Sequence, residues 1–366
     1  ACNTEYLSHV QDADGVTVML QDRLTGREYS LRAKYLYGGD GARSKVLDDA
    51  GLKVEGQLAR AGTAYVIFKA DLSRYVEHRP SILHWIVTPN AAFGEIGFGL
   101  LRAVTPWTQW IAGWGFDMAK GEPDLSPEEC LKKIRILVGD PDLEAEIVRT
   151  SVWYVNQAHA PVYSNGRVFC GGDAVHRHPP SSGLGLNTCV QDSFNLAWKL
   201  AYVIKGYAGP GLLDSYSADR TFAADENLLN STRSTDFITP KSRVSKTFRN
   251  AVLDLAQDHA FARRLVNSGR LSVPAFLTAS RLNTPDSDVF TGDMVPGAPM
   301  DDAPVSGSRT GWLLGEMDTR FQLLYYVEDA SQISAAQAQA LAALAHDRIG
   351  VQAVVVAKTG AAPHGL

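Results

Sequence analysis

Short segments in which apolar and polar residues alternate dominate the first part of the chain. Val16, Val18 and Leu20 alternate with polar neighbours before a turn at residues 22–26, which predicts a hairpin. The chain resumes as a strand that ends in Tyr-Leu-Tyr-Gly-Gly-Asp-Gly at residues 35–41. Further runs separated by Pro, Asn and Gly predict a mostly antiparallel sheet, and they cover residues 64–70, 82–88, 94–103 and 107–116.

Helical spacing replaces this alternation further along. Ser126, followed by Pro127 and two acidic residues, predicts the start of a helix over residues 126–138, and a short strand is expected at residues 152–155. The capping box Thr188-Cys189-Val190-Gln191 predicts the start of a strong second helix. Its apolar positions recur about every 3.6 residues and form one face, made of Val190, Phe194, Ala197, Trp198, Ala201 and Ile204.

The last part of the chain predicts more helices and then a small βαβ unit. Helices are expected over residues 212–232 and 244–266, before Pro-rich loops at residues 274–304. The final segments are a strand at residues 321–327, an Ala-rich helix at 334–346 and a fully buried strand at 351–357.

Composition and charge narrow the class of protein. The chain has 366 residues, of which 45% are hydrophobic, and a net charge of −5, which excludes a disordered chain and favours several folded domains. No long basic run is present, so nucleic acid and anionic membranes are excluded as main partners, and we expect a small-molecule ligand. No uncharged run reaches the about 20 apolar residues of a membrane span. Four scattered cysteines without a CxxC favour reduced thiols and a cytoplasmic protein, and the possibility of a homo-oligomer stays open.

Two segments share one arrangement, in which a strand ends in glycines and an aspartate. They are Gly39-Asp40-Gly41 and Gly172-Asp173-Ala174. Glycine lets the backbone approach a ligand, and an aspartate at the end of a strand can accept a hydrogen bond from a ribose hydroxyl. Because Asp-Gly is also a common turn dipeptide, Asp40-Gly41 taken alone favours a structural turn.

A Gly- and Pro-rich loop continues from the second segment into the predicted helix. Gly183 and Gly185 would let a flat ring or a phosphate lie against backbone amides, and Pro179-Pro180 stiffens the loop. These features predict a binding site for an electron-rich ligand at the start of the helix.

Two other interpretations of this loop are disfavoured. His176 and His178 could suggest zinc, but no third ligand lies at a familiar spacing, so we expect no metal. Ser181 or Ser182 with His176 and Asp173 could form a hydrolase triad, but the chain contains no GxSxG sequence.

Aromatic residues are concentrated in the predicted antiparallel sheet. Four of the seven tryptophans lie there, namely Trp85, Trp107, Trp110 and Trp114. This concentration predicts either a wall for an aromatic ligand or the filling of a core between sheet and helices, and the two interpretations carry equal weight for each tryptophan.

Taken together, residues 166–200 resemble the second FAD-contacting motif of the single-component flavin-dependent aromatic hydroxylases, the p-hydroxybenzoate hydroxylase and phenol hydroxylase family. Residues 35–44 resemble the Asp-Gly motif of the same family, and the two motifs occur in the family's order. The run His176-Arg177-His178-Pro179-Pro180, followed by Gly183-Leu184-Gly185, is specific to the phenol hydroxylase branch. The resemblance extends from Thr4 to about Arg220.

The resemblance implies a mixed α/β fold, with an FAD-binding Rossmann-like domain that is interrupted by an antiparallel substrate sheet. The implied domains are residues 1–50 with 151–235 for FAD, 51–150 for the substrate sheet, 236–290 for a helical segment, and 291–366 for a linker and a partial thioredoxin-like domain. The family's opening GxGxxG unit is absent from this sequence, so we expect an internal fragment of a longer enzyme that binds FAD poorly by itself.

The implied activity is ortho-hydroxylation of a phenol or chlorophenol to a catechol. NAD(P)H would reduce FAD, O2 would form a flavin C4a-hydroperoxide, and the phenolate ring would attack its terminal oxygen. Two alternatives stay open, namely a related hydroxylase of a larger aromatic such as a hydroxyphenylpropionate or a polyketide, and a non-catalytic interaction module.

The resemblance also assigns candidate site residues. We expect Asp173 to bind FAD hydroxyls and Pro179 to lie near the flavin ring and the substrate. The other expected cofactor residues are Asp40, Gly41, Arg43, Gly172, His176, Gly183, Leu184, Gly185, Leu186 and Asn187. The expected substrate pocket is formed by Pro179, His84, Trp85, Phe98, Trp110 and Trp114.

Overall fold

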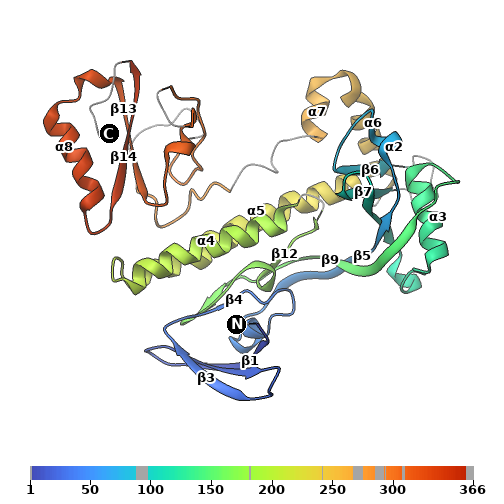
Figure 1. Cartoon of the computed structure of the whole chain (residues 1–366), viewed down its shortest axis with the longest axis horizontal. Helices are drawn as coiled ribbons and strands as arrows, with labels where there is room; N and C mark the ends of the chain where they lie inside the picture. The colour runs from blue at the N-terminus through green and yellow to red at the C-terminus, as the bar shows by residue number, and fades with distance from the viewer. Residues whose placement is uncertain are drawn as a thin grey trace. The chain divides into compact units, whose positions relative to one another are not determined.

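The chain divides into two compact units in the computed structural model shown in Figure 1. Unit 1 comprises Ala1–Asn195 and Tyr216–Ala275, and unit 2 comprises Leu196–Ser215 and Phe276–Leu366. Finer domain boundaries within these units stay predictions. The structure describes residues 2–87, 98–180, 183–240, 242–266, 275–284, 292, 294–306 and 310–359.

A three-stranded antiparallel sheet begins unit 1. β2 (Val16–Asp22) and β3 (Glu28–Ala33) form the predicted hairpin, which is confirmed by their antiparallel pairing. The sequence pattern does not predict β1 (Thr4–Gln11), which pairs with the other edge of β2, because its exposed and half-buried positions do not alternate.

A second, parallel pairing holds the two glycine–aspartate segments. β4 (Leu36–Gly38) pairs in parallel with β11 (Val168–Cys170), and β10 (Ser164–Asn165) lies on the far side of β11. A Cβ atom on Gly38 would lie 2.7 Å from the Val46 side chain, so the glycine lets α1 (Lys45–Asp49) pack against the end of β4.

A six-stranded sheet confirms the predicted antiparallel segment. Its order is β12-β9-β5-β8-β7-β6, and a one-turn helix, α2 (Ser73–Val76), follows β5. Residues 94–97 of the predicted strand at 94–103 lie outside the described residues. The strands are β5 (Glu55–Lys69), β6 (Leu83–Val87), β7 (Phe98–Thr105), β8 (Gln109–Phe116), β9 (Glu146–His159) and β12 (His176–Arg177).

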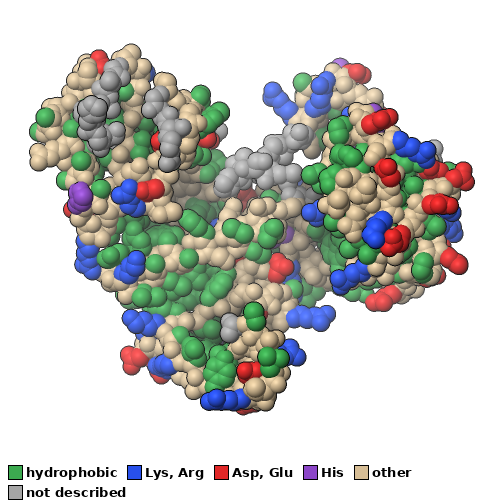
Figure 2. Space-filling view, in the orientation of Figure 1, with side chains coloured by type: hydrophobic (Ala, Val, Ile, Leu, Met, Phe, Trp, Pro, Cys, Tyr) green, Lys and Arg blue, Asp and Glu red, His purple; other side chains and the backbone are tan. Residues whose placement is uncertain are grey.

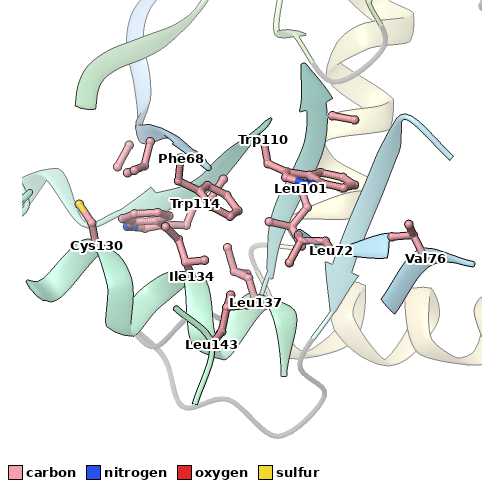
Figure 3. Close-up of a cluster of buried hydrophobic side chains, with 14 residues drawn as sticks. Phe68, Leu72, Val76, Leu101, Trp110, Trp114, Cys130, Ile134, Leu137 and Leu143 are labelled. Carbon is pink, nitrogen blue, oxygen red and sulfur yellow. The ribbon is translucent and has the colours of Figure 1, made fainter. Parts of the chain in front are cut away.

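The hydrophobic core of this sheet lies against α3 (Pro127–Val138), as Figure 3 shows. Ser126 confirms the predicted N-cap, because its Oγ accepts a hydrogen bond from the Glu129 amide at 3.4 Å. The largest side chains of the cluster are aromatic. Its labelled members are Phe68, Leu72, Val76, Leu101, Trp110, Trp114, Cys130, Ile134, Leu137 and Leu143.

α4 (Leu184–Ile204) is the predicted strong helix, but it begins before the predicted capping box. The capping box is wrong because Thr188 lies inside the helix, where its hydroxyl donates to the Leu184 carbonyl oxygen at 2.8 Å. The first part of the apolar face is open to solvent, since Leu186, Val190 and Phe194 are 77%, 61% and 72% exposed. Figure 2 shows hydrophobic side chains gathered over this helix.

The bounds of the remaining helices differ from those that the sequence predicts. α5 (Asp214–Ile238) extends beyond the predicted residues 212–232. The predicted helix at 244–266 is divided into α6 (Arg243–Asp258) and α7 (Ala260–Val266), because His259 has an extended backbone. No helix in the described ranges is long and apolar enough to cross a membrane.

The predicted βαβ unit lies in unit 2. β13 (Phe321–Asp329) and β14 (Val351–Thr359) pair in parallel, and α8 (Ala335–Ala343) connects them after a capping box at Ser334. The prediction that β14 is fully buried is wrong, because the strand is half-buried in a sheet of two strands. A thioredoxin-like identity for this unit stays a prediction.

Candidate functional site

Both glycine–aspartate segments leave the parallel sheet at the same edge. Gly38, at the end of β4, lies opposite Cys170, at the end of β11, and each strand is followed within three residues by the aspartate of its motif, Asp40 or Asp173. Ligands of parallel sheets bind at the carboxyl ends of the strands. The pairing therefore brings two motifs that are far apart in the sequence to one ligand-binding edge.

Asp40 holds the first segment in a turn. One carboxylate oxygen accepts hydrogen bonds from the amides of Lys45 at 2.8 Å and Val46 at 3.2 Å, and the other accepts one from the Ser44 hydroxyl. The carboxylate thus caps the start of α1, and Gly41 provides the left-handed backbone of the turn with φ of 83°. This geometry supports the structural-turn interpretation of Asp40-Gly41.

A cleft in unit 1 joins the second segment to β9. Its volume is about 330 Å³. Its lining combines Asp173 and the glycines at the start of α4 with aromatic and polar residues of β9. The lining residues are Ala42, Trp153, Tyr154, Asn156, Asp173, Arg177, His178, Pro180, Gly183, Gly185 and Leu186.

The start of α4 is open to a ligand. A Cβ atom built on Gly183 or Gly185 would meet no atom of the described residues within 4 Å, and Gly183 has φ of 64°. The first amides of a helix have no partner within the helix, and they favour an electron-rich group. Leu186 follows the glycines in the cleft lining, whereas Asn187 lies outside it and donates to the Gly183 carbonyl oxygen at 2.9 Å.

A buried network of charged side chains supports the Gly172-Asp173-Ala174 segment. Asp192 on α4 is fully buried and accepts hydrogen bonds from the Gly172 amide at 2.9 Å, His176 Nε2 at 2.7 Å and Arg220 Nε at 2.6 Å. Burial raises the pKa of Asp192, but His176, Arg220 and the amide outweigh it and hold that pKa below its usual value. The network fixes the turn that carries Asp173.

Asp173, His176 and Cys189 form a group whose ligand atoms lie within 4.8 Å of one another. Spacing in the sequence does not reveal Cys189 as a possible third ligand. His176 Nε2 is already bonded to Asp192, and burial, followed by the Asp173 charge, raises the pKa of Cys189 to about 12. Cys189 is therefore a thiol whose Sγ lies 3.6 Å from an Asp173 oxygen, rather than the thiolate that metals prefer.

We expect acid to destabilise unit 1 through His178. Burial, and then nearby His176, lowers the pKa of His178 from 6.5 to about 4. The unfolded chain binds more protons between these values, so stability is lost as the pH falls through this window. From pH 7 to pH 5 this loss is about 2 kcal/mol, measured by urea unfolding. His178→Gln should remove that part of the loss, and an unchanged pH dependence in the variant would contradict the assignment.

The expected substrate-pocket residues lie elsewhere in unit 1. Trp110 and Trp114 are 0% and 5% exposed within the core cluster, and His84 Nε2 lies 2.8 Å from the Ser81 carbonyl oxygen. Trp85 is 37% exposed on β6, and Phe98 begins β7 with a side chain outside the described part. The structure does not bring His84, Trp85, Trp110 or Trp114 into the cleft lining.

Comparison with known proteins decides the family. A family model described as an FAD binding domain matches residues 1–231. The chain belongs to this FAD-binding domain family. The matched residues include the edge of parallel strands and the helix start described above, because they cover β4, β11 and the beginning of α4.

Named relatives of this FAD-binding domain protein are monooxygenases. A 2,4-dichlorophenol 6-monooxygenase of Cupriavidus pinatubonensis is 46% identical over 65% of this chain and 40% of the relative. A phenol 2-monooxygenase of a Pseudomonas species is 48% identical over 60% of this chain and 34% of the relative. The matched part therefore spans about 40% or less of these relatives' lengths.

A solved structure shows the same fold. The flavin-dependent monooxygenase PieE, in complex with FAD and substrate, matches with a TM-score of 0.76 and 31% identity, over 97% of this chain and 66% of that chain. Together with the family match, this likeness confirms the predicted fold class, a mixed α/β fold of the p-hydroxybenzoate hydroxylase type.

FAD is the cofactor that the family implies, and the cleft fits its flavin half. Gly183 and Gly185 leave open space for a flat ring, and Asp173 supplies an acceptor for ribityl hydroxyls. Trp153 Nε1 and Arg177 Nε in the cleft lining are buried donors without a partner in the described part of the chain, so a bound ligand with acceptor atoms could satisfy them.

Only some of the expected cofactor residues line the cleft, and others lie next to the lining or in the buried network. Asp173, Gly183, Gly185 and Leu186 line it directly. Gly172 and His176 belong to the buried network. Pro179 and Leu184 are buried beside lining residues, and Arg43 is exposed next to Ala42. Sequence reasoning missed Trp153, Tyr154 and Asn156 as site residues, because the segment Trp153-Tyr154-Val155-Asn156 shows no alternation of aromatic and polar positions that would mark a strand face on a site.

Proposed function

We propose that the protein containing this chain is an FAD- and NAD(P)H-dependent monooxygenase that hydroxylates a phenol, with a chlorinated phenol as the favoured substrate, to a catechol. The cleft carries the proposal, because its lining combines Asp173 and the glycines at the start of α4 with aromatic and hydrogen-bond-donating side chains. The named phenol and dichlorophenol relatives support it.

The identities favour a small phenol over a larger aromatic. Relatives named for dichlorophenol and phenol are 46% to 48% identical to this chain, whereas relatives named for tetracenomycin and polyketides are 34% to 37% identical. We also propose a cytoplasmic location, which the unpaired cysteines support.

Some residues of the cleft would bind the cofactor, and others would bind the substrate. Asp173 would accept a hydrogen bond from an FAD hydroxyl, and the amides at Gly183–Gly185 would face the electron-rich edge of the flavin. FAD, when bound, supplies the transfer of electrons from NAD(P)H to O2. Trp153 and Tyr154 would hold the aromatic substrate, and the neutral His178 would limit charge and water beside it.

Asp173→Ala is expected to weaken FAD binding in the full-length enzyme that contains this chain. Loss of one hydrogen bond to a charged group costs about 1.5 to 3 kcal/mol, so the FAD dissociation constant should rise about 10- to 100-fold. Flavin content after dialysis and fluorescence titration measure the effect. Asp140→Asn, which changes a carboxylate bonded to Arg74 and Tyr75 away from the cleft, is the matched control. Unchanged FAD retention in Asp173→Ala would contradict the assignment.

Product analysis tests the reaction itself. The FAD-loaded enzyme should couple NAD(P)H oxidation to formation of the catechol from 2,4-dichlorophenol, and it should act more slowly on 3-hydroxyphenylpropionate. A preference for the larger acid would favour the alternative substrate class. Absence of any hydroxylated product with FAD bound would favour a non-catalytic module.

A further inference from the structure

Asn156 on β9 is oriented by an irregularity in the neighbouring strand. β5 leaves its regular pairing with β9 between Gln57 and Ala61, and Ala59 has a left-handed backbone with φ of 52°. The Ala59 amide donates a hydrogen bond to Asn156 Oδ1 at 2.9 Å. Because an amide can only donate, the carbonyl oxygen of the side chain must face Ala59.

Because Oδ1 is bonded to Ala59, the Nδ2 donor of Asn156 remains available to a ligand. Nδ2 branches from the same carbon as Oδ1, and it forms no hydrogen bond with any described residue. Asn156 lines the cleft, so a group bound there can meet an amide donor that is already fixed in orientation. Fixing the side chain before binding reduces the entropy lost when the ligand binds.

Two further donors of the cleft lining are buried and lack partners in the described chain. Trp153 Nε1 is one, although the Trp153 ring itself is held edge to face against Tyr65 with centroids 5.2 Å apart. Arg177 Nε on β12 is the other. Buried donors are rarely left unpaired, so a ligand that brings acceptor atoms would satisfy them.

We propose that Trp153, Asn156 and Arg177 form a donor wall that binds the ionised oxygen of a phenol. All three donate hydrogen bonds, Arg177 adds a positive charge, and Trp153 and Tyr154 supply apolar aromatic surface for the ring. A carbonyl of the flavin shares this acceptor chemistry, and the test separates the two sources. The inference rests on the proposed function, and it names residues that select a phenolate over an aromatic ring without oxygen.

The test compares two ligands in the FAD-loaded holoenzyme. 2,4-Dichlorophenol carries the oxygen, and 1,3-dichlorobenzene has the same chlorinated ring without it. Asn156→Asp keeps the acceptor for the Ala59 amide but removes the donor, and Trp153→Phe removes the indole N–H without changing charge. Asn250→Asp on α6 is the matched control, since Asn250 Oδ1 also accepts hydrogen bonds, from Arg249.

We expect each cleft variant to bind 2,4-dichlorophenol about tenfold or more weakly, as measured by perturbation of the flavin absorbance. Affinity for 1,3-dichlorobenzene and for FAD should be unchanged, and the control should match the wild type. Equal losses for both ligands would overturn the proposal in favour of a packing role. A loss confined to FAD affinity would overturn it in favour of a flavin contact.

Failure of the proposed function gives a different result. A wild-type holoenzyme that does not bind 2,4-dichlorophenol at all overturns both the function and the donor wall. Wild-type binding and turnover that stay the same in Asn156→Asp and Trp153→Phe overturn the donor wall alone.

Discussion

Asp192→Ala is expected to lower the free energy of unfolding by about 3 to 5 kcal/mol, because it leaves a buried guanidinium without its carboxylate. Arg220 is 4% exposed, and its Nε lies 2.6 Å from Asp192 Oδ1. The same change removes the acceptor of the Gly172 amide, so the turn that carries Asp173 loses its support. Urea unfolding measures stability, and FAD titration under conditions where the variant stays folded measures the effect on the site.

An exposed ion pair supplies the control for this change. Glu146→Ala removes the partner of Lys69, whose Nζ lies 3.2 Å from a carboxylate that is 66% exposed, and it should cost no more than about 1 kcal/mol. Asp192→Asn keeps the shape of the side chain and should fall between the two. A loss below about 1 kcal/mol in Asp192→Ala would show that the network does not support the fold.

This network illustrates what the sequence can and cannot reveal. The strand that ends in Gly172-Asp173 can be predicted because glycines and an aspartate stop a short apolar run. Asp192 instead follows Gln191 on a helix and has the appearance of a solvated position, since its partners lie 16 and 28 residues away in sequence. Burial of a polar side chain by residues that distant depends on tertiary packing, which no local pattern contains.

The residues that line the cleft also differ in how far the sequence reveals them. The glycines at 183 and 185 can be predicted to face a ligand, because flat groups need close approach to a backbone. The sequence predicts β9 only as a short strand, and it does not reveal the irregular pairing with β5 at which the Ala59 amide donates to Asn156 Oδ1. Tryptophan concentration points instead to β6 and β8, where large aromatic side chains fill a core as readily as they line a pocket.

Trp110→Ala is expected to cost about 3 to 5 kcal/mol of unfolding free energy, since it opens a large cavity in a packed core. Trp110 is fully buried, stacks on Trp107 with centroids 5.9 Å apart, and donates its indole N–H to the Trp107 carbonyl oxygen at 2.8 Å. Urea unfolding measures the loss. Ile82→Ala, at a position that is 60% exposed, should change stability by about 0.5 kcal/mol or less.

The variant Trp110→Phe then distinguishes a core position of Trp110 from a position in the substrate pocket. If Trp110 belongs to the core, this variant loses stability through the unpaired Trp107 carbonyl and the smaller ring, while the folded holoenzyme binds 2,4-dichlorophenol as the wild type does. Unchanged stability with about tenfold weaker phenol binding would instead place Trp110 in the substrate pocket, as the tryptophan pattern alone allows. The core position of Trp110 in Figure 3 favours the first outcome, because a side chain packed among Phe68 and Leu101 has no free face for a ligand.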